Sequence, residues 1–262
     1  EEDRRAARWR KRRIIFNNDG DDVREAQNHH DVNWQFLKRS GGELMDDFLA
    51  ARTTSLMDTQ VDSIWYSTCS GGLWFSHDTK LGGFFEKGIS RELIDTYGRD
   101  DLQIQVDFCH EHDREVFWSL RVNDNHDAPP KGYHRLYTGL DPFKQDHPHC
   151  LMGEPEDWDR YPSGLRRAWT SLDFSYPEVR EHIFSLIEEV CQGYDVDGVE
   201  LDFLRDPVFF APTRDGNPVE LQHVEMMTDL VRRVKRMTEE VEAARGRPLL
   251  VAARTPFTVA DA

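Results

Sequence analysis

The chain has 262 residues, with 33 basic and 49 acidic side chains and a formal net charge of −16. An apolar share of 38% is enough for a buried core, which excludes a disordered tail or a mini-protein. The acidic balance repels a phosphate backbone and argues against nucleic acid as the main ligand, and no apolar run of about 18 residues is present to span a membrane.

The start of the chain is basic. The charges between Arg4 and Arg13 predict a solvated arm over residues 1–12, ahead of one domain over residues 13–262. The chain begins without a methionine and shows no apolar signal-peptide core, so the compartment stays open between the cytoplasm and export after removal of a leader. The four cysteines form no C-x-x-C pair and are expected to be packed thiols.

Five short runs rich in β-branched or aromatic residues end in polar turns, which is typical of strands. They lie at residues 13–18, 61–69, 115–121, 196–203 and 249–253. Strands separated by helices cannot be joined by tight turns, so the alternation indicates a parallel sheet with helical crossovers.

Three helices are predicted between these strands. The first begins with Asp101 as its cap. The second begins at a capping box over residues 175–178 that has proline in the first turn. The third follows Pro218, repeats apolar residues every three or four positions, and ends at Gly246.

The segments after the strands are long and polar, as at the carboxyl-terminal face of an α/β barrel, where active sites are built. The longest covers residues 124–171 and contains Trp158 and Trp169 together with several histidines. We expect it to be a folded loop over the site rather than a separate domain.

Strand four carries two carboxylates. Its alternation turns Val199 and Leu201 toward the helices, so Glu200 and Asp202 face the barrel interior. A buried carboxylate is costly unless it is paired or used, and the strand is otherwise apolar. Asp202, nearer the carboxyl end, is therefore the leading catalytic candidate.

Strand three ends in polar residues that suit a sugar. Alternation projects Arg121 and Asn123 from one face, with Asp124 and His126 in the loop that follows. Arginine and asparagine fix a polyhydroxylated ligand through hydrogen bonds, and a nearby acid or histidine transfers a proton. Turn chemistry explains the asparagine and aspartate equally well. In a purely structural alternative, Arg121 or Arg254 pairs with the strand-four acids.

Metal and cofactor signatures are weak. The turn at residues 17–22 is rich in oxygen ligands but lacks the glutamate of an EF-hand, which leaves Asn17 as a candidate substrate contact. Three histidine groups have no recognised zinc spacing and are expected to be solvated or packed, at residues 29–31, 109–112 and 147–150. No G-x-S-x-G elbow, P-loop or G-x-G-x-x-G follows a strand.

Residues 173–181 and 194–202 resemble the P-E-V-R-E … Y-D-V-D-G-I-x-x-D core of the glycosyl hydrolase-like 10 family, which comprises barrel proteins related to the α-amylase-type glycosidases. Residues 117–127 resemble a variant that is common in bacterial members. The resemblance runs from about Arg13 to Ala253.

The resemblance implies that Asp202 matches the strand-four acid, the position of the nucleophile in many related barrels. Phe203 stands where the motif often has a second aspartate, and Arg254, rather than a glutamate, follows strand five. Glycoside hydrolysis normally needs two carboxyl groups. The second is therefore expected from Glu200, from Asp124 or from outside this chain.

We therefore predict an α/β fold of the (β/α)8 TIM-barrel type, incomplete within residues 1–262 with about five strands, in a hydrolase that cleaves glycosidic bonds of a poly- or oligosaccharide. Catalysis is expected from Asp202, Glu200 and Asp124. Substrate contacts, with the tryptophans as stacking platforms, are expected from Asn17, Arg121, Asn123, His126, Trp74, Trp158, Trp169, Arg205 and Arg254.

The expected partner is a carbohydrate rather than nucleic acid or a membrane, and no cofactor or metal is implied. One alternative is a non-catalytic carbohydrate-binding barrel. A second is a metal-dependent hydrolase that uses Asp19, His126 and Asp202. The sugar, its linkage, the stereochemistry and the oligomeric state are not fixed by the sequence.

Overall fold

A computed structural model describes residues 2–23, 37–69, 71–86, 88–128 and 139–256. The main sheet is parallel throughout, and its strand order is β1-β2-β5-β6-β7. These strands are β1 (Ile15–Asn18), β2 (Ser63–Tyr66), β5 (Glu115–Arg121), β6 (Gly198–Asp202) and β7 (Leu250–Arg254). All five predicted strands are confirmed, and parallel strands in sequential order with helical crossovers form an open part of a (β/α)8 barrel.

Eight α-helices and a second, two-stranded sheet accompany the main sheet in the described residues. The helices are α1 (Glu2–Trp9), α2 (Leu44–Arg52), α3 (Ile89–Tyr97), α4 (Asp101–Glu111), α5 (Pro142–Asp146), α6 (Pro177–Gly193), α7 (Ala211–Arg214) and α8 (Leu221–Arg245). The small parallel sheet pairs β3 (Trp74–Phe75) with β4 (Gly83–Phe84). Each helix in this part of the chain is too short or too polar to traverse a lipid bilayer.

The helix ends correct two predictions. Helix α4 is capped by Asp100, which accepts a hydrogen bond from the backbone N–H of Gln103, whereas Asp101 accepts hydrogen bonds from Tyr66 and another side chain. Helix α6 begins after Tyr176 without a side-chain cap, so the predicted capping box over residues 175–178 is wrong, although proline does occupy the first turn. The predicted end of α8 at Gly246 is confirmed, since this glycine has a φ of 74°.

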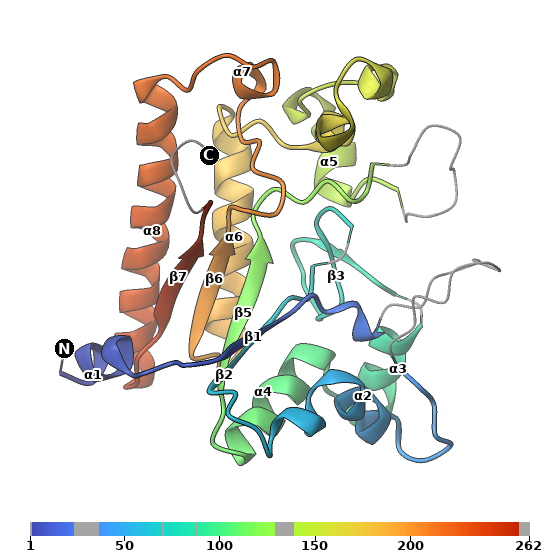
Figure 1. The fold of residues 1–262 in the computed structure, drawn as a ribbon, viewed down its shortest axis with the longest axis vertical. Coiled ribbons are helices and arrows are strands. Elements are labelled where there is room, and N and C mark those ends of the chain that lie inside the picture. The colour runs from blue at the N-terminus through green and yellow to red at the C-terminus, as the bar shows by residue number, and fades with distance from the viewer. Residues whose placement is uncertain (1, 24–36, 70, 87, 129–138, 257–262) are drawn as a thin grey trace.

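The outer face of the main sheet packs against helices. Val199 and Leu201 of β6 are buried in the same hydrophobic core as Ile183 and Leu186 of α6 and Val234 of α8, as the alternation in strand four predicts. Helices α6 and α8 also pack against each other (Figure 1). Burial of this apolar face is the main source of stability for the layered α/β arrangement.

The inner face of the main sheet carries polar side chains at the carboxyl-terminal ends of the strands and aromatic side chains nearer their amino-terminal ends. In-register pairing places Trp65 of β2 and Phe117 of β5 in one row, and their rings stack with centroids 4.9 Å apart. The Phe117 ring also lies over Gly198 of β6, where an added Cβ would be 2.3 Å from a ring carbon. Side chains therefore fill the interior in rows, as they do in a closed barrel.

The sheet is strongly curved. Neighbouring strands lie about 4.8 Å apart, so β1 and β6, which are three positions apart, would be about 14 Å from each other in a flat sheet. Asn17 of β1 nevertheless donates a hydrogen bond of 2.8 Å to Glu200 of β6. Two short side chains reach each other only because the sheet bends around its inner face.

The predicted solvated arm contains helix α1, which has no buried residue and is attached to the barrel by ion pairs. Arg4 of α1 forms ion pairs with Glu239 and Glu242 of α8, and Arg12 pairs with Glu115 at the start of β5. Figure 1 shows α1 beside the end of α8 that lies away from the strand arrowheads. The basic charges thus neutralise acidic residues at the amino-terminal end of the sheet.

The long segment 124–171 contains several short helices in its described part. They are α5 and four 3₁₀ turns, at Pro148–Cys150, Pro155–Asp159, Ser163–Leu165 and Ala168–Thr170. Lys144 of α5 is fully buried and donates to Asp127 at 2.8 Å and to the carbonyl oxygen of Asp124 at 3.0 Å. This buried pair ties the insertion to the loop that follows β5.

Candidate active site

The candidate site lies at the carboxyl-terminal edge of the main sheet. Arg121, Asp202 and Arg254 are in register on the adjacent strands β5, β6 and β7, so their side chains emerge on the same inner face. Ser119 and Glu200 form the next row down. The residues that end the strands therefore form one polar surface.

Both carboxyl oxygens of Asp202 have partners. One of its oxygens, Oδ1, accepts hydrogen bonds from the backbone N–H groups of Leu204 and Arg205 at 3.0 and 3.2 Å. Its other oxygen, Oδ2, lies 3.1 Å from Nη2 of Arg254. The side chain of Asp202 is only 3% exposed, whereas that of Arg254 is 33% exposed. The ion pair with Arg254 that the structural alternative requires is thus present.

Glu200 lies deeper in the interior. Its Oε2 accepts hydrogen bonds from Asn17 and from Ser119. Burial raises the pKa of Glu200, although these two hydrogen bonds and the charge of Arg254 oppose the rise. The residue joins β1, β5 and β6 from the inside.

Asp124 connects the loops at this edge. Its Oδ1 accepts from the backbone N–H groups of Gly72 and His126, both at 2.8 Å, and its Oδ2 accepts from Arg121 at 3.2 Å and from Nδ1 of His126 at 3.0 Å. Burial alone would raise the pKa of Asp124. The hydrogen bond and charge of His126, together with the charge of Arg121, outweigh burial and hold that pKa well below its usual range.

Arg121 and His126 face other carboxylates as well. Arg121 also pairs with Asp19, which follows β1, at 2.9 Å, and the Asp19 side chain is 51% exposed. Nδ1 of His126 lies 3.7 Å from Oδ2 of Asp206, a buried oxygen that has no hydrogen-bond partner among the residues that the structure describes. Burial, and then the charge of Asp124, raise the pKa of Asp206 to about 6.

The carboxylates of Asp124 and Asp206 and the imidazole of His126 offer ligand atoms within 4.8 Å of one another. They fit a metal poorly, because each oxygen of Asp124 already accepts two hydrogen bonds. The metal-dependent alternative required Asp19 and Asp202 beside His126. Those two aspartates belong to no group of three potential ligands in the part of the chain that the structure describes.

Comparison with known proteins fits this polar, barrel-type edge. The model of one protein family, described as Glycosyl hydrolase-like 10, matches residues 48–217. The chain belongs to the glycosyl hydrolase-like 10 family. The family resemblance predicted from the sequence is thus confirmed, and no curated protein matches the chain.

Several solved structures are similar to this family member at low identity. The alpha-L-fucosidase isoenzyme 2 from Paenibacillus thiaminolyticus is 16% identical with a TM-score of 0.46, covering 92% of this chain and 32% of its own. The alpha-amylase from Geobacillus thermoleovorans is 16% identical with a TM-score of 0.46, and the match covers 90% of this chain and 45% of the amylase. The alpha-galactosidase from Lactobacillus brevis is 11% identical with a TM-score of 0.45, and the match covers 93% of this chain and 27% of the galactosidase. This chain spans less than half the length of each.

Two of the expected substrate-binding residues of this glycosyl hydrolase-like 10 chain are engaged inside the protein. The side-chain amide of Asn123 donates to the carbonyl oxygens of Leu172 and Val208 and accepts from the N–H of Leu172, so it fastens two loops to each other. Trp169 is buried, which removes it from the surface as a stacking platform. Its burial follows from the folded insertion, which the sequence pattern does not specify.

The other expected contacts differ in accessibility. Trp158 is half-buried, and Trp74, also half-buried, donates to the carbonyl oxygen of Gly139 and stacks on Phe85. Arg205 is exposed in the loop after β6. Of the histidine groups considered for metal binding, residues 29–31 lie outside the described residues.

Sequence reasoning missed Asp206 as a site residue. It lies four positions after Asp202, in the loop that follows β6, where barrel active sites are built. The sequence does not show that His126, from the loop after β5, lies beside Asp206. A search of the strand-end loops for further carboxylates would have found it.

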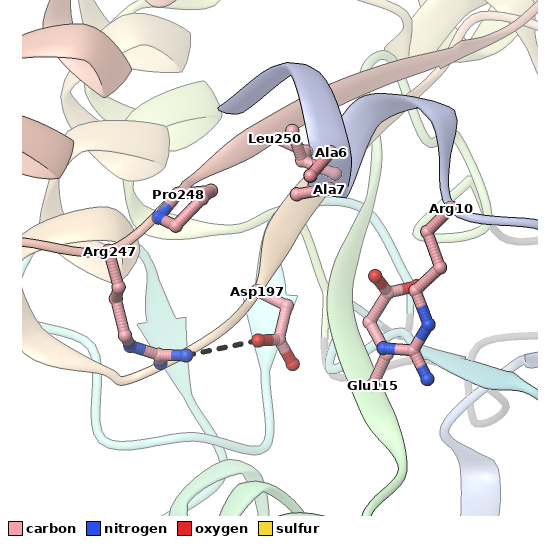
Figure 2. A pocket seen from close by; sticks show the side chains of 8 residues that line it. All are labelled: Ala6, Ala7, Arg10, Glu115, Asp197, Arg247, Pro248 and Leu250. Atoms are coloured by element: carbon pink, nitrogen blue, oxygen red, sulfur yellow. Dashed lines mark hydrogen bonds and ion pairs between the residues drawn. The ribbon is translucent and has the colours of Figure 1, made fainter. Parts of the chain in front are cut away.

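A cavity of about 440 Å³ lies at the opposite end of the sheet. Figure 2 shows its lining by α1 and by residues at the starts of β5, β6 and β7, with Asp197 and Arg247 joined by an ion pair of 3.0 Å. Glu115, another lining residue, pairs with Arg12. This end of a barrel serves stability, so the cavity is not part of the candidate active site.

Proposed function

We propose that this chain hydrolyses a glycosidic bond of a poly- or oligosaccharide, with Asp202 facing the reacting sugar carbon and Asp206 donating the proton. The observation that carries the proposal is the pair of unlike carboxyl environments at one sheet edge. Asp202 is bonded to Arg254 and to two backbone N–H groups, whereas Oδ2 of Asp206 has no hydrogen-bond partner in the described part of the chain. Two titratable groups with different environments suit the two roles of glycoside hydrolysis.

The proposed reaction divides the work between these carboxyl groups. The protonated Asp206 gives its proton to the glycosidic oxygen as the bond from that oxygen to the sugar carbon breaks, so the leaving sugar departs as an alcohol. The negative charge of Asp202 stabilises the positive charge that develops on the sugar carbon, or attacks it. Water supplies the hydroxyl group of the product and returns a proton to Asp206.

The remaining polar residues have supporting roles in this proposal. Arg121, His126 and the exposed Asp19 line the same edge and offer hydrogen bonds to sugar hydroxyl groups. Glu200 and Asp124 become positioning residues in this proposal, because Glu200 lies one row below Asp202 and joins the strands through Oε2, and both oxygens of Asp124 join the loops.

A leaving-group comparison tests the proposal. The protein is assayed against a panel of 4-nitrophenyl glycosides and against unactivated polysaccharides, with release of reducing ends as the readout. In Asp206→Asn, hydrolysis of unactivated substrate is expected to fall by at least about a hundredfold. Hydrolysis of the 4-nitrophenyl glycoside, whose leaving group needs no proton, is expected to fall by less than about tenfold.

The control is Asp58→Asn, an exposed residue that precedes β2 at the other end of the sheet. It is expected to match the unmodified protein on both substrates. Equal losses on both substrates in Asp206→Asn would remove Asp206 as the proton donor. Absence of hydrolysis across the whole panel would overturn the proposed function itself.

A non-catalytic carbohydrate-binding barrel is the second candidate. It is favoured by one observation: both oxygens of Asp202 already have partners in Arg254 and the backbone. In that case, oligosaccharides stabilise the protein in thermal melts without any release of reducing ends, and Asp202→Asn leaves the sugar-dependent shift in melting temperature intact.

A further inference from the structure

A second cluster of polar residues lies outside the candidate active site, where the insertion meets the start of α6. His149 and Cys150 belong to the 3₁₀ turn Pro148–Cys150, and Glu178 belongs to the first turn of α6. Their ligand atoms, an imidazole nitrogen, the Sγ and a carboxylate oxygen, all lie within 4.8 Å of one another. Nε2 of His149 is 2.9 Å from Oε1 of Glu178.

His147 lies next to this cluster but is not one of its members. Its Nδ1 lies 3.0 Å from the carbonyl oxygen of Phe143, and its ring stacks on Phe143 with centroids 4.3 Å apart. The cluster therefore offers three protein ligands, one fewer than the four positions of a tetrahedral zinc ion.

We propose that His149, Cys150 and Glu178 bind one zinc ion, with water in the fourth position. A thiolate, an imidazole and a carboxylate are ligand types that zinc takes in tetrahedral sites, and sulfur disfavours calcium and magnesium. The sequence predicts solvated or packed histidines at residues 147–150, because no three ligands have a recognised zinc spacing there. The fold adds Glu178, which lies 28 positions after Cys150.

The ion would fasten the insertion to the barrel. Residues 147–150 come from the insertion, whereas Glu178 is in a helix whose buried face packs in the core. Just beyond the cluster, Leu151 pairs with Leu172, and Met152 donates to the carbonyl oxygen of Ser171. A zinc ion at this cluster would therefore stabilise the start of the insertion, next to the contacts that Leu151 and Met152 make with residues 172 and 171.

Zinc content and thermal melts test the proposal. The protein, freed of metal with a chelator and titrated with zinc chloride, is expected to bind one equivalent of zinc. A hundredfold excess over the dissociation constant is expected to raise its melting temperature by about 5 °C or more. Cobalt is expected to give a sulfur-to-cobalt charge-transfer absorption that is absent from Cys150→Ser.

Two of the proposed ligands are exposed enough to be substituted without unfolding the protein. His149→Ala and Glu178→Gln alter side chains that are 54% and 39% exposed, so both variants are expected to fold and to bind zinc at least about tenfold more weakly. The matched control Cys109→Ser changes a buried thiol in α4 and is expected to keep full affinity. Absence of one-equivalent binding to the unmodified protein, or equal affinity in all variants, would overturn the site.

Discussion

Replacing Asp202 with asparagine separates the catalytic role of this residue from its structural role. Asparagine keeps the oxygen that accepts from Leu204 and Arg205 but removes the negative charge that Arg254 neutralises. If Asp202 stabilises the charge that develops on the sugar carbon, hydrolysis is expected to fall by more than about a hundredfold.

The structure sets the expected cost in stability. The Arg254 side chain is one third exposed, so after the substitution its charge is still solvated, and the loss is that of a partly exposed pair, about 1–2 kcal/mol. For a chain of this size, such a loss lowers the melting temperature by about 2–6 °C. A fully buried pair would cost about 3–5 kcal/mol instead.

Arg254→Met is the matched variant. It removes the same ion pair but leaves the carboxylate and its two backbone hydrogen bonds. We expect a similar drop in melting temperature and a loss of activity at least about tenfold smaller than in Asp202→Asn. Melts and sugar-release assays on the same samples provide the measurement. Equal losses of activity in the two variants, or an Asp202→Asn protein that keeps its activity per folded molecule, would refute the catalytic reasoning.

Three further outcomes are expected. Lys144→Met leaves the buried Asp127 without its partner and is expected to lower the free energy of unfolding by about 3–5 kcal/mol in urea titrations. Gly198→Ala places a Cβ 2.3 Å from the Phe117 ring and is expected to cost about 1–3 kcal/mol in the same assay. Because the proton donor must be protonated and the pKa of Asp206 is about 6, activity is expected to fall as pH rises above about 6, and this limb of the profile is expected to be lost in Asp206→Asn.

Two controls accompany the stability predictions. Lys80→Met removes an exposed ion pair with Asp78 and is expected to change the free energy of unfolding by less than about 1 kcal/mol. Gly193→Ala adds a Cβ where no atom lies within 4 Å, and it is expected to be neutral or slightly stabilising. Losses in the controls as large as those at Lys144 and Gly198 would show that burial and contact are not the causes.

Alternation along the strands was sufficient to predict the two faces of the sheet. Leu201 is buried among helices, while Glu200 and Asp202 turn inward, because side chains alternate strictly along a strand and only one face of this sheet meets the helical layer. The curvature that brings Asn17 to Glu200 is a property of the whole sheet, and no local pattern of residues encodes it.

The contacts of the insertion join residues far apart in the sequence, and local sequence patterns do not predict them. The side chain of Asn123 bonds to residues 49 and 85 positions away, and Lys144 is buried against a carboxylate 17 positions earlier. Such contacts depend on the path of the chain in space, so the burial of Trp169 and the partial burial of Trp158 were not predictable from composition. The same holds for Asp206, whose neighbour His126 comes from another strand-end loop.

Asp124 explains why this edge is suited to chemistry. One buried carboxylate with four hydrogen bonds joins Gly72 before β3, Arg121 at the end of β5, and His126 beyond it. Burial, and then the charge of Asp124, raise the pKa of the neighbouring Asp206 to about 6. In the proposed function, a fixed anion that holds the ligand-facing groups in place and raises the pKa of a second acid serves both positioning and proton transfer. The interior row below, in which Glu200 is bonded to Asn17 and Ser119, fixes the strands that carry these groups.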